Sequence, residues 1–470
     1  MESMIKENSL TFKEIEQKIF AECCRAAREA TQNFLEEYDQ YLMEGRDKKA
    51  YRAKGHRKAT VKTVYGEVTY SRNVYETHDE NGQKKFVYLL DETLDLKIVG
   101  AISQNYAAQL VNVITTSSYR NCAKEVSETT GQGISAMGVW NVVQALGEEI
   151  GKGEKELAEK HSKDPIHGDR TVPVLFEEAD GVNLNLQGKD RIGKANGKAE
   201  MKVAIAYDGW KKVGAGRYML DGKVAFAEFA QSKDFHRIRE AKIAAEYDLD
   251  EVKVRLLNGD GASWIKEVPD CDTIFQLDPF HRNKAVREKI HNTQAQGDIM
   301  DFLKDGDTSG MFSYLKTYKD SLADDAEIKD AEELTRYFKA NESGLLPYQS
   351  RARLPESPTG LEYRNMGTME NHIWSIVASR MKHNHTSWSI AGGNNIAKLL
   401  TKKCEGRLGE VIDRVRKPLF EEEKTEELLG QVLPARQNPE RVGKGYGYPV
   451  RGSIPALEAA LRGGGWNILH

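Results

Sequence analysis

Several features that define other protein classes are missing from this sequence of 470 residues. No run of about 18 apolar residues occurs, which argues against a membrane-spanning helix. The first residues, MESMIKENSLTFKEIEQ, lack the apolar core of a signal peptide, so we expect a cytoplasmic protein. The five cysteines form neither a CxxC pair nor a zinc-binding spacing, and we expect them to be reduced and structural: Cys23, Cys24, Cys122, Cys271 and Cys404.

Charge is plentiful but unevenly distributed. The formal net charge is −4, whereas residues 46–62, RDKKAYRAKGHRKATVK, hold eight Lys or Arg and one Asp. A basic block in an acidic protein is typical of a surface that binds a phosphate backbone. A solvated loop is the equally simple alternative. The length predicts about two to four compact units.

The N-terminal third is mainly helical by its periodicity. Residues 10–45 place apolar side chains three and four apart, which predicts one long helix whose apolar face covers a core or a second chain. Strand-like alternation on both sides of Gly66 predicts a hairpin over 60–76. Residues 117–147 contain a helix, a Gly-containing break, Ser135 as a helix N-cap, and a second helix over 135–147 as the candidate recognition helix. That order favours a helix-turn-helix, although two short helices around a glycine also occur in many all-α domains.

Beyond a linker at 159–170 the pattern changes to strands. Three successive antiparallel strands, a helix, a fourth strand, a helix and a fifth strand are expected between 172 and 281. One of these strands is expected over 200–213, and Asp180 is expected at a turn between two strands. This is the element order of an α/β ribonuclease H-like catalytic core. The expected regions are 1–100 (helix and basic hairpin), 101–165 (helix-turn-helix), 170–282 (first part of the core), 283–362 (all-α insertion), 363–405 (closing helix) and 406–470 (helix and Gly/Arg-rich tail).

Three acids occupy matching places in this order. Asp180 ends the first strand, Asp260 ends the fourth, and Glu370 opens the helix after the insertion. Neighbouring first and fourth strands would bring the two aspartates together, and the closing helix would bring Glu370. Three converging carboxylates require a counter-charge, and two Mg²⁺ or Mn²⁺ ions roughly 3.5–4 Å apart would suit phosphoryl transfer.

Each acid also has a simpler explanation. Asp180-Gly181 is a favourable hairpin turn, and Asp260-Gly261 suits a strand-to-helix turn. Glu370 would complement a helix dipole wherever it stood in a first turn. Only the three acids taken together, in this element order, favour a metal site.

Longer motifs carry a family resemblance. Residues 258–286, NGDGASWIKEVPDCDTIFQLDPFHRNKAV, resemble the second-acid block of the mutator-like DDE transposases, with Asp260 as the acid and Asp278, His281, Arg282 and Asn283 as the following D-x-x-H-R-N run. Glu370-Asn371 and Asp180-Gly181-Val182 match the third and first blocks. The stretch KTVYGEVTYSRNVYE resembles a hairpin block of the bacterial Lre-type insertion-sequence transposases. The resemblance covers most of residues 50–405.

By this resemblance the sequence is similar to that of a bacterial, nucleoid-associated DDE transposase. It implies that Asp180, Asp260 and Glu370 bind the metal ions and that Asp278 and His281 support them; His281 could instead serve only to anchor its helix. Implied partners are the terminal inverted repeats and target DNA, bound by a homodimer or larger oligomer. Candidate DNA contacts are Arg52, Lys54, Arg57, Lys58, Lys62, Arg72, Arg120, Arg380 and Lys382. Trp374, after the third acid, could be a core residue.

Two other functions remain open at this stage. A ribonuclease H-like nuclease would cleave strands without joining them. A domesticated DNA-binding protein would keep the fold without chemistry, but it would be expected to have lost an acid, and all three are present.

Overall fold

The computed structural model describes residues 10–94, 102–267, 273–383 and 385–412. The Gly/Arg-rich tail expected near the C-terminus and Cys271 lie outside these ranges. The chain divides into two units, one comprising residues 1–58, 70–86 and 417–470, the other residues 59–69 and 87–416. Each is described by itself. Among the described residues, no helix is both long enough and apolar enough to cross a membrane.

The first unit is built on a long helix and most of a small sheet. Helix α1 (Phe12–Gly45) begins at Thr11 with a capping box shared with Glu14. Its apolar face is buried only in its second half, at Leu35 and Tyr38; Phe12 is 79% exposed. Buried Asp39 fixes the helix to the sheet, because its Oδ2 accepts hydrogen bonds of 2.7 Å from both the backbone and the side chain of Asn73.

The hairpin expected around Gly66 is present. Strands β1 (Arg52–Thr63) and β2 (Gly66–His78) join β3 (Lys84–Val87) in the order β1-β2-β3. Gly66 has a φ of 126°, which favours glycine at this turn. The basic block is therefore largely strand and not loop, since its second half forms β1.

The second unit begins with short helices. After α2 (Leu89–Leu94) and α3 (Gln104–Ile114), helix α4 (Tyr119–Thr130) ends at left-handed Gly131, and α5 (Ala136–Lys163) begins after Ser135, whose side chain accepts from the Gly138 amide. The expected pair of helices around a glycine is therefore present. Helix α5 runs 28 residues, so the expected recognition helix is only its first half.

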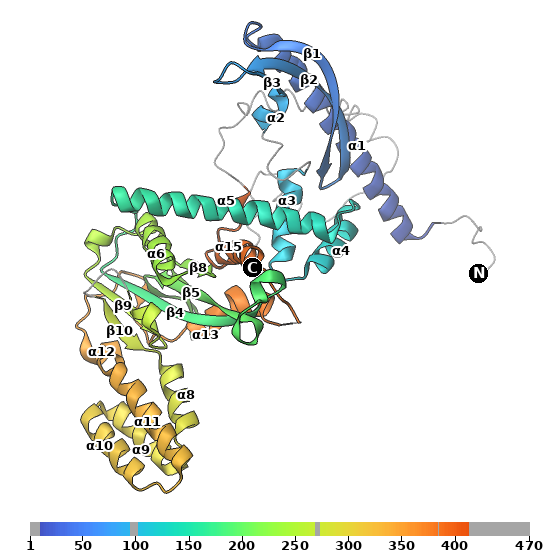
Figure 1. Ribbon diagram of the computed structural model, residues 1–470. Coiled ribbons are helices and arrows are strands. Elements are labelled where there is room, and N and C mark those ends of the chain that lie inside the picture. The colour runs from blue at the N-terminus through green and yellow to red at the C-terminus, as the bar shows by residue number, and fades with distance from the viewer. Residues whose placement is uncertain (1–9, 95–101, 268–272, 384, 413–470) are drawn as a thin grey trace, which may run out of the picture. The chain divides into compact units, whose positions relative to one another are not determined.

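A five-stranded mixed sheet forms the centre of the second unit (Figure 1), with β4 (Val174–Asn185), β5 (Lys198–Tyr207), β8 (Val224–Glu228), β9 (Val254–Gly259) and β10 (Ile274–Leu277). The strand order is β10-β9-β4-β5-β8. Pairs β4–β5 and β5–β8 are antiparallel, whereas β4–β9 and β9–β10 are parallel. The mixed α/β class expected from the sequence is confirmed.

Two local expectations were wrong. Asp180 does not stand at a turn, because β4 continues unbroken through Asp180-Gly181 to Asn185. The Glu200 side chain of β5 packs over Gly181 instead: a Cβ there would lie 2.1 Å from its carboxylate oxygen, so the Glu200 side chain would have to move. The strand expected over 200–213 is broken at Asp208, and its second part, β6 (Gly209–Gly214), pairs with β7 (Arg217–Asp221) and β11 (Leu361–Glu362) in a separate sheet.

Helices cover both faces of the central sheet. On one face Val174, Phe176 and Val203 pack in a core with side chains of α3, α4 and α5 and of α15 (Ile390–Cys404). On the other, Leu175, Ala179 and Ala204 pack with α6 (Ser232–Glu246) and α7 (Ser263–Lys266). Alternate residues of β4 thus enter two different cores, as the two-residue period of a strand requires.

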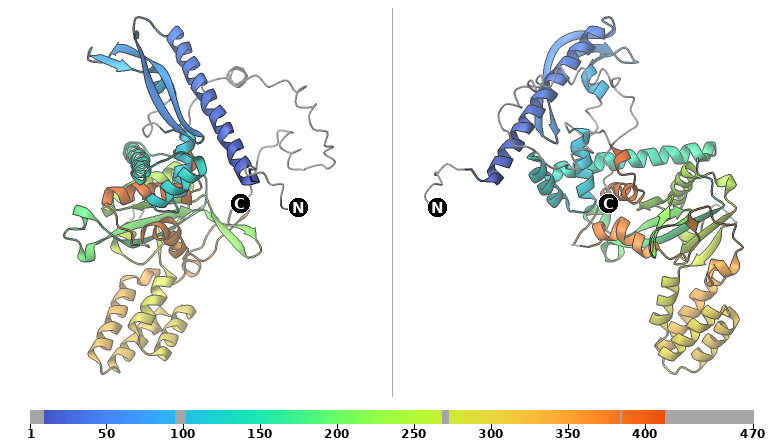
Figure 2. Two further views of the ribbon diagram at one scale, coloured as in Figure 1. Left: turned by 90° about the vertical axis from the view of Figure 1, so that its right-hand side faces the viewer. Right: turned by 180° about the vertical axis from the view of Figure 1, so that it is seen from behind.

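The segment after β10 is helical, with a core of its own. Helices α8 (Pro279–Lys289), α9 (Thr293–Asp305), α10 (Thr308–Asp320) and α11 (Asp325–Ala340) form a bundle (Figures 1 and 2), followed by the short α12 (Tyr348–Arg351). Its core includes Ile299, Leu315 and Phe338. The chain then returns through α13 (Met369–His372), a π-helical turn (Ile373–Ala378) and α14 (Ser379–Met381).

Candidate active site

The pairing of β4 with β9 determines where two of the predicted acids lie. Parallel register runs from Val174 opposite Val254 to Ala179 opposite Gly259. Asp180 and Asp260 each follow the last residue of this register, so they lie at the same edge of the sheet, and Asp180 is close enough to help raise the pKa of Asp260. Asp180 is 9% exposed. Two aspartates 80 residues apart in the sequence therefore become neighbours.

Both carboxylates are held by short-range hydrogen bonds. Asp180 accepts from the Gly181 amide at 2.7 Å and lies 3.3 Å from His281 Nε2. Asp260 Oδ1 accepts from the Ala262 amide at 2.8 Å. The turn interpretation of Asp260 is thus correct for its backbone. It does not account for the second aspartate beside it.

Negative charge accumulates at this edge of the sheet. Burial raises the pKa of the Asp260 carboxyl, and the adjacent Asp180 adds to the rise. The hydrogen bond with Asp180 raises the pKa of His281, and the charges of Asp180, Asp278 and Asp260 raise it further, although burial opposes them. This edge therefore favours a cation, whether imidazolium or a metal ion.

Asp278 and His281 belong to the start of α8. Asp278 caps the helix by accepting from the Phe280 amide at 2.7 Å, and its other oxygen accepts from the Asn258 side chain at 2.6 Å. His281 lies in the first turn of the same helix and faces Asp180. The D-x-x-H run therefore fixes the helix and also contacts a predicted metal ligand.

Glu370 is placed differently. It lies in α13 and is exposed, and within the described ranges its carboxylate takes part in no hydrogen bond or ion pair. In the described part of the chain, the three predicted carboxylates do not lie within coordinating distance of one another. Across those ranges, the only group of three acidic or His residues with ligand atoms within 4.8 Å of one another is His167, Asp248 and Asp250, two of which are exposed.

A buried acid that sequence reasoning missed joins these segments. Glu178 has no exposed surface. Its Oε1 accepts from Tyr207 Oη and Thr368 Oγ1, each at 2.7 Å. Its Oε2 accepts from the amides of Gly367 and Thr368 at 3.0 and 2.9 Å and from Asn258 Nδ2 at 3.0 Å. Burial raises its pKa, although the Tyr207 and Thr368 hydrogen bonds act to lower it.

Asn258 extends this arrangement, since its side-chain nitrogen donates to both Glu178 and Asp278. We call Glu178, Asn258, Asp278 and Thr368 the Glu178 cluster. The sequence offered one signal for it: the consecutive acids Glu177 and Glu178 directly follow the apolar residues Val174, Leu175 and Phe176 in the same strand.

A cavity of about 400 Å³ adjoins Asp260. It is lined by Asp260 and His281, by Lys284 of α8, and by Tyr337 of α11, among others. Tyr337 also donates to the Asp260 carbonyl at 2.7 Å. The helical insertion therefore forms part of the surroundings of the predicted acids.

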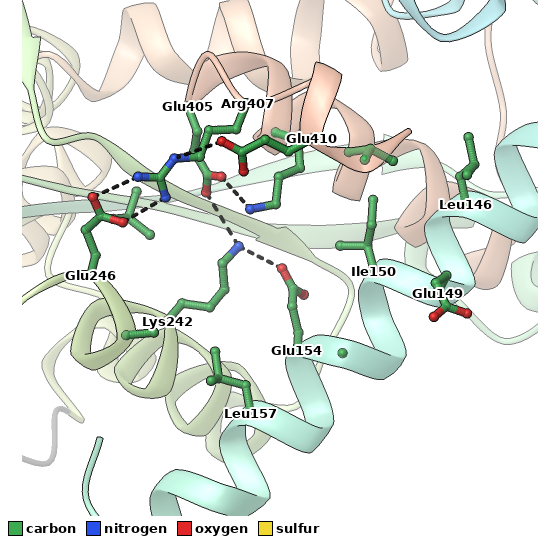
Figure 3. A pocket seen from close by; sticks show the side chains of 15 residues that line it. Leu146, Glu149, Ile150, Glu154, Leu157, Lys242, Glu246, Glu405, Arg407 and Glu410 are labelled. Carbon is green, nitrogen blue, oxygen red and sulfur yellow. Dashed lines mark hydrogen bonds and ion pairs between the residues drawn. The ribbon is translucent and has the colours of Figure 1, made fainter. Parts of the chain in front are cut away.

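A second cavity of about 400 Å³ lies between α5, α6 and the region after α15 (Figure 3). Its charged side chains are engaged with one another: Lys242 lies 2.7 Å from Glu154 and 3.6 Å from Glu405, and Arg407 lies 2.7 Å from Glu246. None of the predicted site residues lines it.

The predicted DNA contacts fall into two groups. The first group is exposed and consists of Arg52, Arg57 and Lys58 on β1, Arg120 on α4, and Lys382 after α14. Lys54 is also exposed but lies 2.9 Å from Glu76. The remaining three are engaged within the fold. Lys62 donates to the Gly133 carbonyl at 2.8 Å. Burial raises the pKa of Asp39, and the charge of half-buried Arg72 partly opposes that rise.

Arg380 requires a correction. It is 7% exposed, donates to the Ile114 carbonyl at 3.0 Å, and lies over the rings of Tyr119 and Trp388. A guanidinium in that position stabilises helix packing and is poorly placed to contact phosphate. Trp374, expected as a possible core residue, is 56% exposed.

Comparison with known proteins gives a match to a family model and a weak similarity to a solved structure. A family model described as an uncharacterised protein family, UPF0236, matches residues 5–417. No curated protein matches the chain. A solved structure described as a pre-cleavage Mos1 transpososome shares 10% identity over 52% of this chain and 80% of its own, with a TM-score of 0.12. A TM-score this low does not establish a shared fold.

Proposed function

The chain belongs to the uncharacterised protein family UPF0236, and we propose that it is a DDE transposase acting at the ends of an insertion sequence. In this proposal Asp180, Asp260 and Glu370 bind two Mg²⁺ or Mn²⁺ ions, and the central sheet is a ribonuclease H-like core. The observation that carries the proposal is the parallel register of β4 and β9, which sets Asp180 beside Asp260.

The strand order and directions support the core assignment. Three antiparallel strands, β8, β5 and β4, are followed in space by β9 and β10, each parallel to its neighbour. The first and fourth core strands are therefore adjacent, as the ribonuclease H-like interpretation of the sequence requires.

The residues present fit a hard divalent cation. Carboxylate oxygens are the ligands that Mg²⁺ and Mn²⁺ prefer. Asp260 uses one oxygen for the Ala262 amide, and in the described part of the chain its other oxygen has no hydrogen-bond partner. Burial raises the pKa of Asp260, and the charges of Asp180 and Asp278 add to the rise, so a bound cation would relieve an unfavourable charge. Bound ions would activate a water or 3′-hydroxyl and stabilise the leaving oxygen.

The chain's own groups would position the reaction. His281 orients the Asp180 carboxylate through the 3.3 Å contact. The exposed cations of β1, with Arg120 and Lys382, would contact the DNA backbone and so fix its register on the protein. The glycine-linked pair α4 and α5 would read the terminal repeat, with exposed Met137 and Trp140 at the start of α5.

A strand-transfer assay tests this function. We expect the full chain, with Mn²⁺ and pre-cleaved ends of the repeats that bracket its gene, to join those ends to a target plasmid. Cleavage of uncut ends without joining would instead identify a nuclease. DNA binding without either reaction would identify a non-catalytic DNA-binding protein.

A further inference from the structure

The Glu178 cluster connects segments that are far apart in the sequence. Glu178 lies on β4, Asn258 near the end of β9, Asp278 at the start of α8, and Thr368 directly before α13. Asn258 and Asp278 are buried with Glu178, and the cluster is joined by side-chain and backbone hydrogen bonds of 2.6–3.0 Å. The cluster thus ties four chain segments together at one point.

The cluster members share a spacing with the predicted metal ligands. Glu178, Asn258 and Thr368 each stand two residues before a predicted ligand, namely Asp180, Asp260 and Glu370. In a strand, residues two apart point to the same face, so on β4 the cluster member and the ligand share a face. The N–H groups of Gly367 and Thr368 bind Glu178 and so fix the start of the segment that carries Glu370.

We propose that Glu178 is a positioning residue, which sets the distance between the three segments carrying Asp180, Asp260 and Glu370 through its hydrogen bonds to Asn258 and Thr368. The inference rests on the proposed function. It adds a residue that the family resemblance does not assign, and it explains why a strand facing an apolar core keeps a buried acid. A misplacement of about 1 Å in such a site can lower a rate by about 10²-fold.

The test uses one hydroxyl. Thr368→Val is nearly isosteric and removes the 2.7 Å hydrogen bond to Glu178 Oε1. Thr368→Ser keeps that hydroxyl. Thr401→Val is the matched control, because it removes a hydroxyl hydrogen bond of 2.9 Å to the Lys398 carbonyl in α15, outside the cluster. Single-turnover cleavage of terminal-repeat DNA, its Mn²⁺ dependence, DNA affinity and melting temperature are measured for all four full-length chains.

We expect Thr368→Val to cleave at least about tenfold more slowly and to need more Mn²⁺ for half-maximal rate, with unchanged DNA affinity. Thr368→Ser should recover most of the loss, and Thr401→Val should match the wild type in rate and Mn²⁺ dependence. A purely structural role would lower the melting temperature without moving the Mn²⁺ dependence. If Thr368→Val melts well below the wild type, Glu178→Gln decides by the same two kinetic readouts.

Failure of this inference differs from failure of the proposed function. A wild-type chain that neither cleaves DNA nor binds Mn²⁺ would overturn the transposase proposal. A wild-type chain that cleaves, together with a Thr368→Val chain equal to it in rate and Mn²⁺ dependence, would overturn only the positioning role of Glu178.

Discussion

Glu177 and Glu178 are adjacent in β4 and both are fully buried, yet they face opposite sides of the sheet and meet opposite surroundings. Glu177 is ion-paired with Arg239 and Arg255, and Arg255 also binds Glu240. Burial acts to raise the pKa of Glu177, but the two guanidinium groups outweigh it and hold the pKa below its usual value. Glu178, by contrast, accepts hydrogen bonds from uncharged donors alone among the residues that the structure describes.

The same contrast extends along each face. On the Glu177 side, the carboxylates are paired with guanidinium groups of the same fold. On the Glu178 side, Asp180 and Asp260 stand next to each other, Asp278 lies nearby, and His281 is the histidine that contacts Asp180. One side of the strand is therefore arranged for stability, and the other retains an excess of negative charge that a divalent cation would relieve.

The largest expected effect comes from breaking the balanced side. Glu177→Gln removes a carboxylate that pairs with both Arg239 and Arg255, which are buried, and we expect a loss of about 3–5 kcal/mol in the free energy of unfolding. Urea denaturation of the apo protein measures it. Arg255 would still pair with Glu240 in this variant. A loss of less than about 1 kcal/mol in the free energy of unfolding would mean that the ion pairs of Glu177 contribute little.

On the Glu178 side of β4, substitution of His281 should lower the free energy of unfolding by an amount that depends on pH. A raised folded-state pKa means that the contact with Asp180 stabilises the fold fully below about pH 6.5, the unfolded value, and loses this effect as the pH rises through the folded value. We expect His281→Gln to cost about 1.5–3 kcal/mol at pH 5.5 and less at pH 9. Equal losses at both pH values would argue against a charged His281.

Asp260→Asn should shift stability in the direction opposite to Glu177→Gln. The Asp260 carboxylate is buried and repels Asp180, so its charge destabilises the folded apo protein. Asn can still accept the hydrogen bond from the Ala262 amide, and we therefore expect the free energy of unfolding at pH 7 to rise by up to about 1 kcal/mol. Mn²⁺ should stabilise the wild type more than this variant. Thermal melts with and without Mn²⁺ check both points; a destabilised apo variant would contradict the charge imbalance.

The smallest effects concern cations. Exposed Arg57 and Lys58 are each expected to contact one phosphate, so each Ala substitution should reduce the slope of log K against log salt by about 0.9. Arg380→Met should leave the slope unchanged, because its guanidinium is already engaged by Ile114 and two aromatic rings. A reduced slope in Arg380→Met would return that residue to the DNA interface.

The sequence predicted the features that depend on short-range pattern. Asp260 follows a β-branched run and precedes glycine, so its place at a strand end was visible, as was the Ser135 cap. Asp180 was misplaced because Asp-Gly is a common hairpin turn, whereas Gly181 here accommodates Glu200 from the neighbouring strand. That close approach arises only once β4 and β5 pair.

Tertiary contacts also account for the other differences. Arg380 belongs to a basic stretch of a helix, and nothing nearby in the sequence shows that Tyr119 and Ile114, more than 250 residues earlier, bury it. Glu178 was overlooked because its donors come from β5, β9 and the residues before α13. Periodicity predicts which elements form; it does not predict which distant groups will share one carboxylate.

The most direct test of the account is metal-dependent cleavage of terminal-repeat DNA by the wild type and by Asp260→Ala, with DNA affinity measured in parallel. We predict cleavage by the wild type in Mg²⁺ or Mn²⁺, loss of at least about 10³-fold in the variant, and nearly equal DNA affinity for both. Cleavage retained by Asp260→Ala would contradict the assignment of the Asp180–Asp260 pair as the catalytic centre.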